Sequence, residues 1–180
     1  VMIFAALLIN VFFWLAVGPA PTTPVFQAGS ALAVCTVIIF FMGLKDDIIG
    51  LAASKKLLVH LGVGLMLITA GGYKIQTFGG LFGIEELPEA LSLLFSLFVY
   101  IVVVNSLNLI DGVDGLVGGY SVIAMSAFAF WFLNTGQTAD AILALTMAGA
   151  MLGFLVFNFA PARIFLGDSG SLLVGLVAYA

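Results

Sequence analysis

Charged residues are scarce in this sequence. Only 8% of its 180 residues are charged, 63% are hydrophobic, and the mean hydropathy is +1.29. A water-soluble domain needs polar side chains to cover its exterior, so this composition excludes one. The few lysines and arginines also exclude the basic surface that a nucleic-acid-binding protein requires. The sequence therefore predicts an all-α polytopic protein that sits in a lipid bilayer and binds no nucleic acid.

Cysteine is nearly absent as well. Cys35 is the only one and lies in an apolar run, which excludes an intramolecular disulfide. No cleavable signal peptide is recognisable, because no basic residues precede the first apolar run. That run, Val1–Val17, is barely long enough to span a bilayer, and the last, Ser171–Ala180, has about half of the ~20 residues needed. We therefore expect 1–180 to be a single transmembrane domain, cut at both ends from a longer protein.

Apolar runs and polar segments alternate along the chain and predict a bundle of membrane helices. The helix-breaking residues 18–24 follow the first run. The runs are Val1–Val17, Ala28–Leu44, Leu57–Gly72, Ala90–Val104, Val117–Leu133, Ala141–Phe157 and Ser171–Ala180.

Alternation assigns the polar segments to two sides of the membrane. If every run spans, one side receives the segments 45–56, 105–116 and 158–171. The other side receives the segments 18–28, 73–89 and 134–140. Lys74 is the only basic residue in the second set, whereas the first set holds Lys45, Lys55, Lys56 and Arg163. Because basic loops stay in the cytoplasm, the first set is predicted to face the cytoplasm.

One external segment carries a strand pattern. Lys74–Phe78 alternates polar and apolar residues before Gly79 and Gly80. This alternation followed by glycines predicts a small β-hairpin outside the membrane.

Two amides and two carboxylates recur at every third position after the fourth run: Asn105, Asn108, Asp111 and Asp114. Three-residue spacing nearly eclipses side chains on a 3₁₀ turn and spreads them over about half of an α-helix. They can converge if the backbone tightens or breaks near Gly112 and Gly115. Their oxygens are hard ligands suited to Mg²⁺ or Mn²⁺. Ionisable groups at membrane depth are functional by default, which favours a site over a turn whose side chains only cap helices.

Asp46 and Asp47 stand side by side at the end of the second run. Adjacent residues on a helix point about 100° apart, so we expect the two carboxylates to have different tasks. One can approach a metal or phosphate while the other pairs with Lys45, Lys55 or Lys56. By itself the pair rather favours the alternative, a charged boundary at the water interface.

The stretch from Gly167 to Ser171, Gly-Asp-Ser-Gly-Ser, opens the last run, and Arg163 stands just before it. Glycines permit close backbone approach, and the amides at a helix start attract an anion or phosphate. Arg163 can add a charge-assisted contact to a phosphate. Alone, the stretch fits an ordinary Ser or Asp N-cap equally well. Combined with the other two motifs, it puts three acidic clusters on one face, as in a metal-assisted phosphoryl-transfer site.

Three motifs together resemble the polyprenyl-phosphate N-acetylhexosamine-1-phosphate transferases. They are Lys45–Leu51, Asn105–Leu116 and Phe165–Ser171, in the family's order and with similar loop lengths. The family contains the bacterial enzymes that start lipid-linked O-antigen, enterobacterial common antigen and teichoic acid. It also contains the phospho-MurNAc-pentapeptide transferase of peptidoglycan synthesis.

The resemblance implies a multi-pass enzyme of the bacterial cytoplasmic membrane whose Mg²⁺-dependent site faces the cytoplasm, with Mn²⁺ as an alternative ion. Such an enzyme moves a HexNAc-1-phosphate from a UDP-sugar to undecaprenyl or another polyprenyl phosphate and releases UMP. This is the first membrane step of cell-envelope polysaccharide synthesis, including that of lipopolysaccharide. A homodimer is compatible with the resemblance.

The resemblance also implies roles for individual residues. The metal ligands are Asn108 and Asp168. The catalytic carboxylates are Asp46, Asp47, Asp111 and Asp114, the first two at the lipid phosphate as base or orienting group. The substrate contacts are Asn105, Arg163 and Ser169.

Ser169 bears on the choice of donor. The resemblance favours the GlcNAc branch, because the peptidoglycan branch usually has valine at this position. The phospho-MurNAc-pentapeptide transferase stays the alternative within the family. A CDP-alcohol phosphotransferase would need a contiguous Asp-Gly-Ala-Arg-type signature, which is absent. A cation-coupled transporter would place its carboxylates near helix midpoints, whereas here they cluster at one face.

Overall fold

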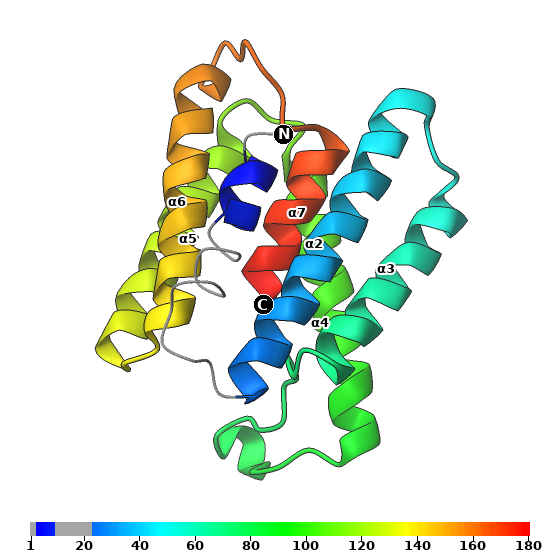
Figure 1. Cartoon of the computed structure of the whole chain (residues 1–180), viewed down its shortest axis with the longest axis vertical. Coiled ribbons are helices and arrows are strands. Elements are labelled where there is room, and N and C mark those ends of the chain that lie inside the picture. Colours follow the sequence, from blue (N-terminus) through cyan, green and yellow to red (C-terminus); the bar gives the residue numbers. More distant parts are fainter. Residues whose placement is uncertain (1–2, 10–22) are drawn as a thin grey trace.

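The computed structural model describes residues 3–9 and 23–180 (Figure 1). Residues 3–9 are helical, and so is every longer element in the described part of the chain, which confirms the all-α prediction. The elements are α2 (Thr23–Ile49), α3 (Ala53–Thr69), the 3₁₀ helix η1 (Leu81–Gly83), α4 (Glu89–Ile110), α5 (Leu116–Asn134), α6 (Thr138–Asn158) and α7 (Gly167–Tyr179).

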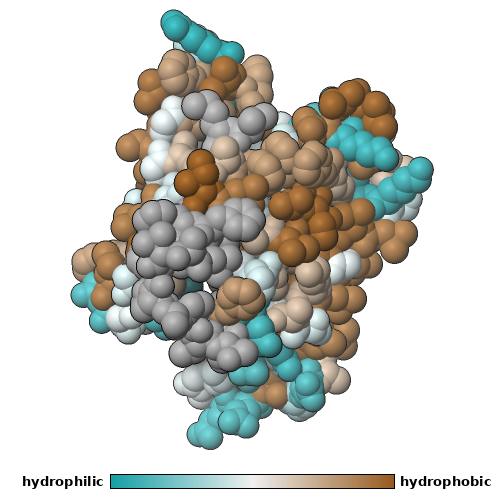
Figure 2. Space-filling view, in the orientation of Figure 1, coloured by the Kyte–Doolittle hydropathy of each residue, from teal (hydrophilic) through white to brown (hydrophobic). Residues whose placement is uncertain are grey.

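Four of these helices are long and apolar enough to cross a membrane: Phe26–Ile49, Glu89–Ile110, Leu116–Asn134 and Thr138–Asn158. With 17 and 13 residues, α3 and α7 are shorter. Figure 2 shows apolar side chains over the middle of the molecule and hydrophilic ones gathered toward its ends. The protein is therefore a multi-pass membrane protein. Residues 1–2 and 10–17 of the first predicted run lie outside the described residues.

Two helices extend further than the apolar runs predict. α2 begins at Thr23 and ends at Ile49, and α4 continues through the polar motif to Ile110. Pro24 is tolerated because the first turn of a helix needs no amide donor there. Isolated polar residues do not break a helix, but Gly50, with φ +68°, ends α2 in the left-handed region. Residues 18–22 of the predicted loop lie outside the described part.

The predicted β-hairpin is wrong in its strands. Thr77 and Glu86 form a single isolated antiparallel bridge, and η1 lies between them. The hydroxyl of Ser96 accepts a hydrogen bond from the amide of Ile75, and the hydroxyl of Ser92 donates to the carbonyl of Ile75. Because α4 satisfies both backbone groups of Ile75, this residue needs no partner on a second strand.

α7, drawn in red in Figure 1, lies at the centre of the bundle. Every residue from Ser171 to Val177 is buried. α2 and α4 pack against α7, α3 packs against α2 and α4, and α5 and α6 pair with each other. Side chains of α7 join both apolar cores, which accounts for a short helix that is apolar on all sides.

Two glycines allow this central helix to touch its neighbours. A Cβ added at Gly43 of α2 would lie 2.5 Å from the Cα of Ser169, and one at Gly175 would lie 2.7 Å from the Cα of Val104. The backbones of α2, α4 and α7 are therefore in direct contact, as small residues permit in membrane bundles. The contact at Gly43 sets the C-terminal part of α2 against the first turn of α7.

The polar segments 45–56, 105–116 and 158–171 lie at the same end of the bundle, at the top of Figure 1. The loop between α3 and α4 and the turn between α5 and α6 lie at the opposite end. The predicted grouping of the segments is therefore confirmed for all those within the described residues.

We expect Gly43→Ala to destabilise the protein by about 2 kcal/mol, because the added methyl group would force the backbones of α2 and α7 apart. The matched control is Gly149→Ala on α6, where an added Cβ meets no heavy atom within 4 Å. This control should be neutral or gain about 0.5–1 kcal/mol from helix propensity. Thermal unfolding of both variants in the same detergent checks the expectation, and equal midpoints would contradict it.

Candidate active site

Two carboxylates hold the start of α7. The amide of Gly167 donates to Oδ2 of Asp111 at 3.1 Å. The amides of Asp168 and Ser169 donate to Oδ1 and Oδ2 of Asp47 at 2.8 and 3.1 Å. The first amides of a helix lack partners within it and carry its positive dipole end, so carboxylates suit them well. The anions at these three amides are carboxylates of the chain itself.

Gly167 is required at this junction for two reasons. Its φ of +70° lies in the left-handed region, which strains other residues. A Cβ here would also lie 3.0 Å from Oδ2 of Asp47. Any side chain would therefore push the Asp47 carboxylate away from the amides that it caps.

Asp46 points to a different neighbour. Its Oδ2 forms an ion pair with the ammonium of Lys56 on α3, and its Oδ1 accepts the amide of Leu51 at 2.6 Å. The same ammonium contacts Oδ2 of Asp168 at 3.0 Å. The side chain of Asp46 is only 7% exposed, so this pairing compensates a nearly buried charge. Asp46 and Asp47 therefore have different partners, and of the three lysines considered, Lys56 is the one that pairs.

Asn108 connects α4 with the first turn of α7. Its Nδ2 donates to Oδ1 of Asp168 at 2.9 Å and to the hydroxyl of Ser171 at 2.8 Å. The Ser171 hydroxyl in turn donates to the carbonyl of Gly167 at 2.9 Å. Asp168 is therefore oriented by Asn108 on one oxygen and by Lys56 on the other.

The four side chains at three-residue spacing do not all converge. Asn108 and Asp111 reach α7, but Nδ2 of Asn105 donates to the carbonyl of Ile101 in its own helix at 2.7 Å. Oδ2 of Asp114 accepts the amide of Ala162, at 3.0 Å, in the loop before α7. For the two amides the reason is that α4 keeps its α-helical geometry to Ile110, so a step of three residues turns the side chain by about 60°.

Asp111 is the least compensated carboxylate of the cluster. Its Oδ1 is buried and has no hydrogen-bond partner among the described residues. Burial raises the pKa of the Asp111 carboxyl above its ordinary value, the Gly167 amide opposes this shift, and the charges of Asp168 and Asp47 add to it. Such an oxygen, half-surrounded by negative charge, is suited to bind a cation.

Two predicted substrate contacts remain at the edge of this cluster. Arg163 is exposed, and no ion pair with its side chain occurs within residues 3–9 and 23–180. Ser169 takes part through its backbone amide, which Asp47 accepts. Among the described residues, neither side chain forms a hydrogen bond or ion pair with the carboxylates.

Sequence reasoning missed Asn158, the last residue of α6. It is 1% exposed, and its amide group bonds two separate backbone segments of the site. The available signal was a single amide at the end of an apolar run, which is equally typical of an ordinary helix end.

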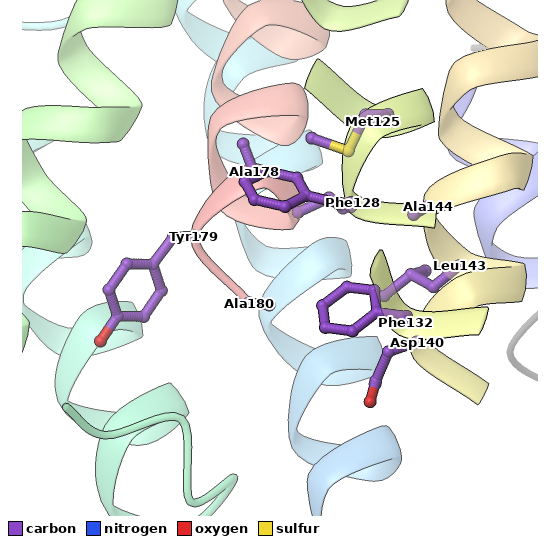
Figure 3. A pocket seen from close by; sticks show the side chains of 10 residues that line it. Met125, Phe128, Phe132, Asp140, Leu143, Ala144, Ala178, Tyr179 and Ala180 are labelled. Carbon is purple, nitrogen blue, oxygen red and sulfur yellow. The ribbon is translucent and has the colours of Figure 1, made fainter. Parts of the chain in front are cut away.

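A cavity of about 160 Å³ lies near the other end of the bundle, among α5, α6 and the end of α7 (Figure 3). Aromatic and aliphatic side chains line it together with Asp140. Tyr179 points away from this group, and its hydroxyl donates to the carbonyl of Tyr73 at 2.9 Å. The cavity shares no residue with the carboxylate cluster.

Residues 30–180 match the sequence model of the family described as glycosyl transferase family 4. The chain belongs to this family. The chain is 39% identical over 147 residues to a probable undecaprenyl-phosphate N-acetylglucosaminyl 1-phosphate transferase of Bacillus subtilis, covering 81% of the chain and 41% of the relative.

Two further relatives widen the comparison. A decaprenyl-phosphate N-acetylglucosaminephosphotransferase of Mycobacterium tuberculosis is 36% identical over 160 residues, which cover 82% of the chain and 39% of the relative. A phospho-N-acetylmuramoyl-pentapeptide-transferase of Staphylococcus aureus is 32% identical over 165 residues, which cover 83% of the chain and 51% of the relative. The chain thus spans about two fifths to one half of the length of these curated relatives.

We expect Asp47→Ala to loosen the start of α7, because two amides lose their acceptor and the helix dipole loses a charge. The loss should be about 1–2 kcal/mol of stability, as for other N-caps. Amide hydrogen exchange at Asp168 and Ser169 should accelerate in the same variant. Glu86→Ala, which removes an exposed carboxylate in the loop before α4, is the control. Unchanged exchange at both amides would rule out the capping role.

Proposed function

We propose that this protein transfers a HexNAc-1-phosphate, with GlcNAc-1-phosphate favoured, from a UDP-sugar to a polyprenyl phosphate such as undecaprenyl phosphate, releasing UMP. Membership of glycosyl transferase family 4 and the printed names of the relatives support this reaction class. The observation that carries the proposal is the set of contacts that three aspartates make at the start of α7. Asp47 and Asp111 accept its first amides, and Asp46 pairs with Lys56, which also contacts Asp168 of α7. These contacts gather the acidic groups at one end of an apolar bundle.

The position of this cluster, at the end of the apolar bundle, suits one lipid substrate and one water-soluble substrate. A polyprenyl phosphate keeps its chain in the bilayer and presents its phosphate at the membrane face. The cluster lies at the end of helices whose sides are apolar (Figure 2), so a lipid phosphate and a soluble nucleotide sugar can meet there. Both substrates are anionic, and bringing their phosphates together requires positive charge at the site.

A Mg²⁺ ion, or Mn²⁺ in its place, is the proposed source of that charge. In the described part of the chain no three His, Cys, Asp or Glu side chains converge as a complete metal cage. Mg²⁺ commonly takes only one or two carboxylates and completes its shell with water and substrate phosphates. Asp168 and the unpartnered oxygen of Asp111 fit this mode, with the amide oxygen of Asn108 as a further proposed ligand. When bound, such an ion neutralises phosphate charge and polarises the phosphoryl group.

The contacts separate the proposed roles of the two adjacent aspartates. Both oxygens of Asp47 accept amides of α7, so we assign it the orienting role. Asp46 shares Lys56 with Asp168, which favours Asp46 and Lys56 as the groups that meet the lipid phosphate. Lys56 would bind that phosphate, and Asp46 would accept its proton if it arrives protonated.

The remaining predicted residues surround this centre. Asp114 accepts the amide of Ala162, so we assign it to holding the loop before α7. Exposed Asn105 and Arg163 are proposed contacts to the nucleotide sugar, Arg163 through its charge. Ser169 is proposed to contact the donor beside Asp47.

We infer that the site faces the cytoplasm of a bacterial cell and that the protein lies in the cytoplasmic membrane. The support is the charge distribution at the two ends of the bundle. Lys45, Lys55, Lys56 and Arg163 belong to the end that carries the site, and Lys74 belongs to the other.

Transfer of phospho-MurNAc-pentapeptide is the second candidate reaction, because one relative of that name is 32% identical over 83% of the chain. Ser169 and the higher identities of the N-acetylglucosamine relatives, 39% and 36%, favour the first candidate. Membranes that contain the protein in full, offered each UDP-sugar in turn, distinguish the two.

The direct test measures UMP release by such membranes with UDP-GlcNAc, undecaprenyl phosphate and Mg²⁺. We expect release that requires all three components and falls at least about 100-fold in Asp168→Asn, because the variant loses the charge held between Asn108 and Lys56. Asp140→Asn, at the opposite end of the bundle, should keep its activity. If folded protein releases no UMP with UDP-GlcNAc or any other UDP-HexNAc donor, the transferase proposal is rejected and a cation transporter is favoured.

The metal proposal is tested without substrates by titrating the detergent-purified protein with Mn²⁺ and following the free ion by electron paramagnetic resonance. We expect Asp111→Asn to weaken Mn²⁺ binding by about tenfold or more, since it removes the uncompensated carboxylate. Asp140→Asn serves again as the control. Equal Mn²⁺ affinity in Asp111→Asn and the unaltered protein would remove Asp111 from the metal site.

A further inference from the structure

Asn158 joins two segments that carry site residues. Its Oδ1 accepts the amide of Gly115 at 2.9 Å, and its Nδ2 donates to the carbonyl of Ile164 at 2.9 Å. Gly115 closes the turn after α4, and Ile164 lies in the loop that leads into α7. One buried side chain at the end of α6 therefore fixes that turn against that loop.

One of the two segments so joined carries Asp111, one of the two carboxylates that cap α7. The turn 111–115 contains Asp111, whose Oδ2 accepts the amide of Gly167, three residues after Ile164. A second bond, from the amide of Ala162 to Asp114, connects the same two segments. The position of Asp111 relative to α7 thus depends on how firmly the turn and the loop are held together.

Asparagine suits this position better than other residues of its size. The site needs one acceptor and one donor from a single short planar group, which an amide supplies. Aspartate would keep the acceptor for Gly115 but would set an unpaired charge against the carbonyl of Ile164. Leucine would leave both backbone groups without a partner. At 1% exposure, Asn158 cannot itself touch a substrate, so it acts only through the residues that it holds.

We propose that Asn158 is a positioning residue of the transferase site, which fixes the Asp111 turn against the loop that begins α7. Its effect on catalysis rests on the proposed function, whereas its effect on the geometry does not. The two effects are therefore measured separately, on the same variants.

The geometric arm follows amide hydrogen exchange at Gly167, which Asn158 does not contact. Asn158→Leu should accelerate this exchange by about tenfold or more, because the Asp111 acceptor loses its fixed position. Asn158→Asp, which keeps the shape and the bond from Gly115, is the deciding variant if the leucine variant does not fold, and it should accelerate exchange in the same direction. The control is Ser121→Ala on α5, a side chain also 1% exposed, whose hydroxyl has no partner among the described residues.

The kinetic arm uses membranes that contain the protein in full. Misplacement of Asp111 should lower kcat by about 100-fold in Asn158→Asp while KM for the UDP-sugar changes much less. Ser121→Ala should keep both values. Wild-type Gly167 exchange together with wild-type kcat in Asn158→Asp would overturn the inference. Faster exchange in a protein whose unaltered form releases no UMP would sustain the positioning role and reject the proposed function instead.

Discussion

The site depends on the hydrogen bonds that the first amides of α7 donate to Asp47 and Asp111. A helix that begins near a membrane surface exposes amides with no internal partner, and its dipole makes that end positive. Carboxylates from the end of α2 and from the turn after α4 satisfy both requirements at once. The end of α2, the turn after α4 and the start of α7, which are distant in sequence, are thereby held together. Asp168, in the first turn of α7, lies at the same place.

These hydrogen bonds also determine how charge is distributed at the site. Asp46, Asp47, Asp111 and Asp168 gather in a small region, and Lys56 is the cation that pairs with two of them. Negative charge remains in excess near Asp111. Burial and the two neighbouring carboxylate charges oppose its ionisation and raise its pKa. A site of this kind is costly without a cation, which is the physical reason to connect it with a divalent metal and phosphate substrates.

The apolar part of the molecule supplies the rigidity that the polar end requires. Gly43 and Gly175 let α7 touch the backbones of α2 and α4, so the position of its first turn is determined by direct contact. The pair of α5 and α6 lies further from the carboxylates and reaches them through Asn158. Site geometry thus draws on helices that supply none of the acidic side chains in contact with α7.

The sequence by itself determined the membrane environment, the helical class and the grouping of the polar segments, because composition and local pattern carry that information. It did not determine which residues of the site contact one another. Asp47 caps a helix 121 residues further on, Lys56 rather than Lys45 or Lys55 pairs with Asp46, and Asn105 turns away from Asn108. The predicted hairpin failed for the same reason, because Ser92 and Ser96 of α4 bond both backbone groups of Ile75. Such choices depend on distances between segments that only helix packing brings together, so only the tertiary structure could decide them.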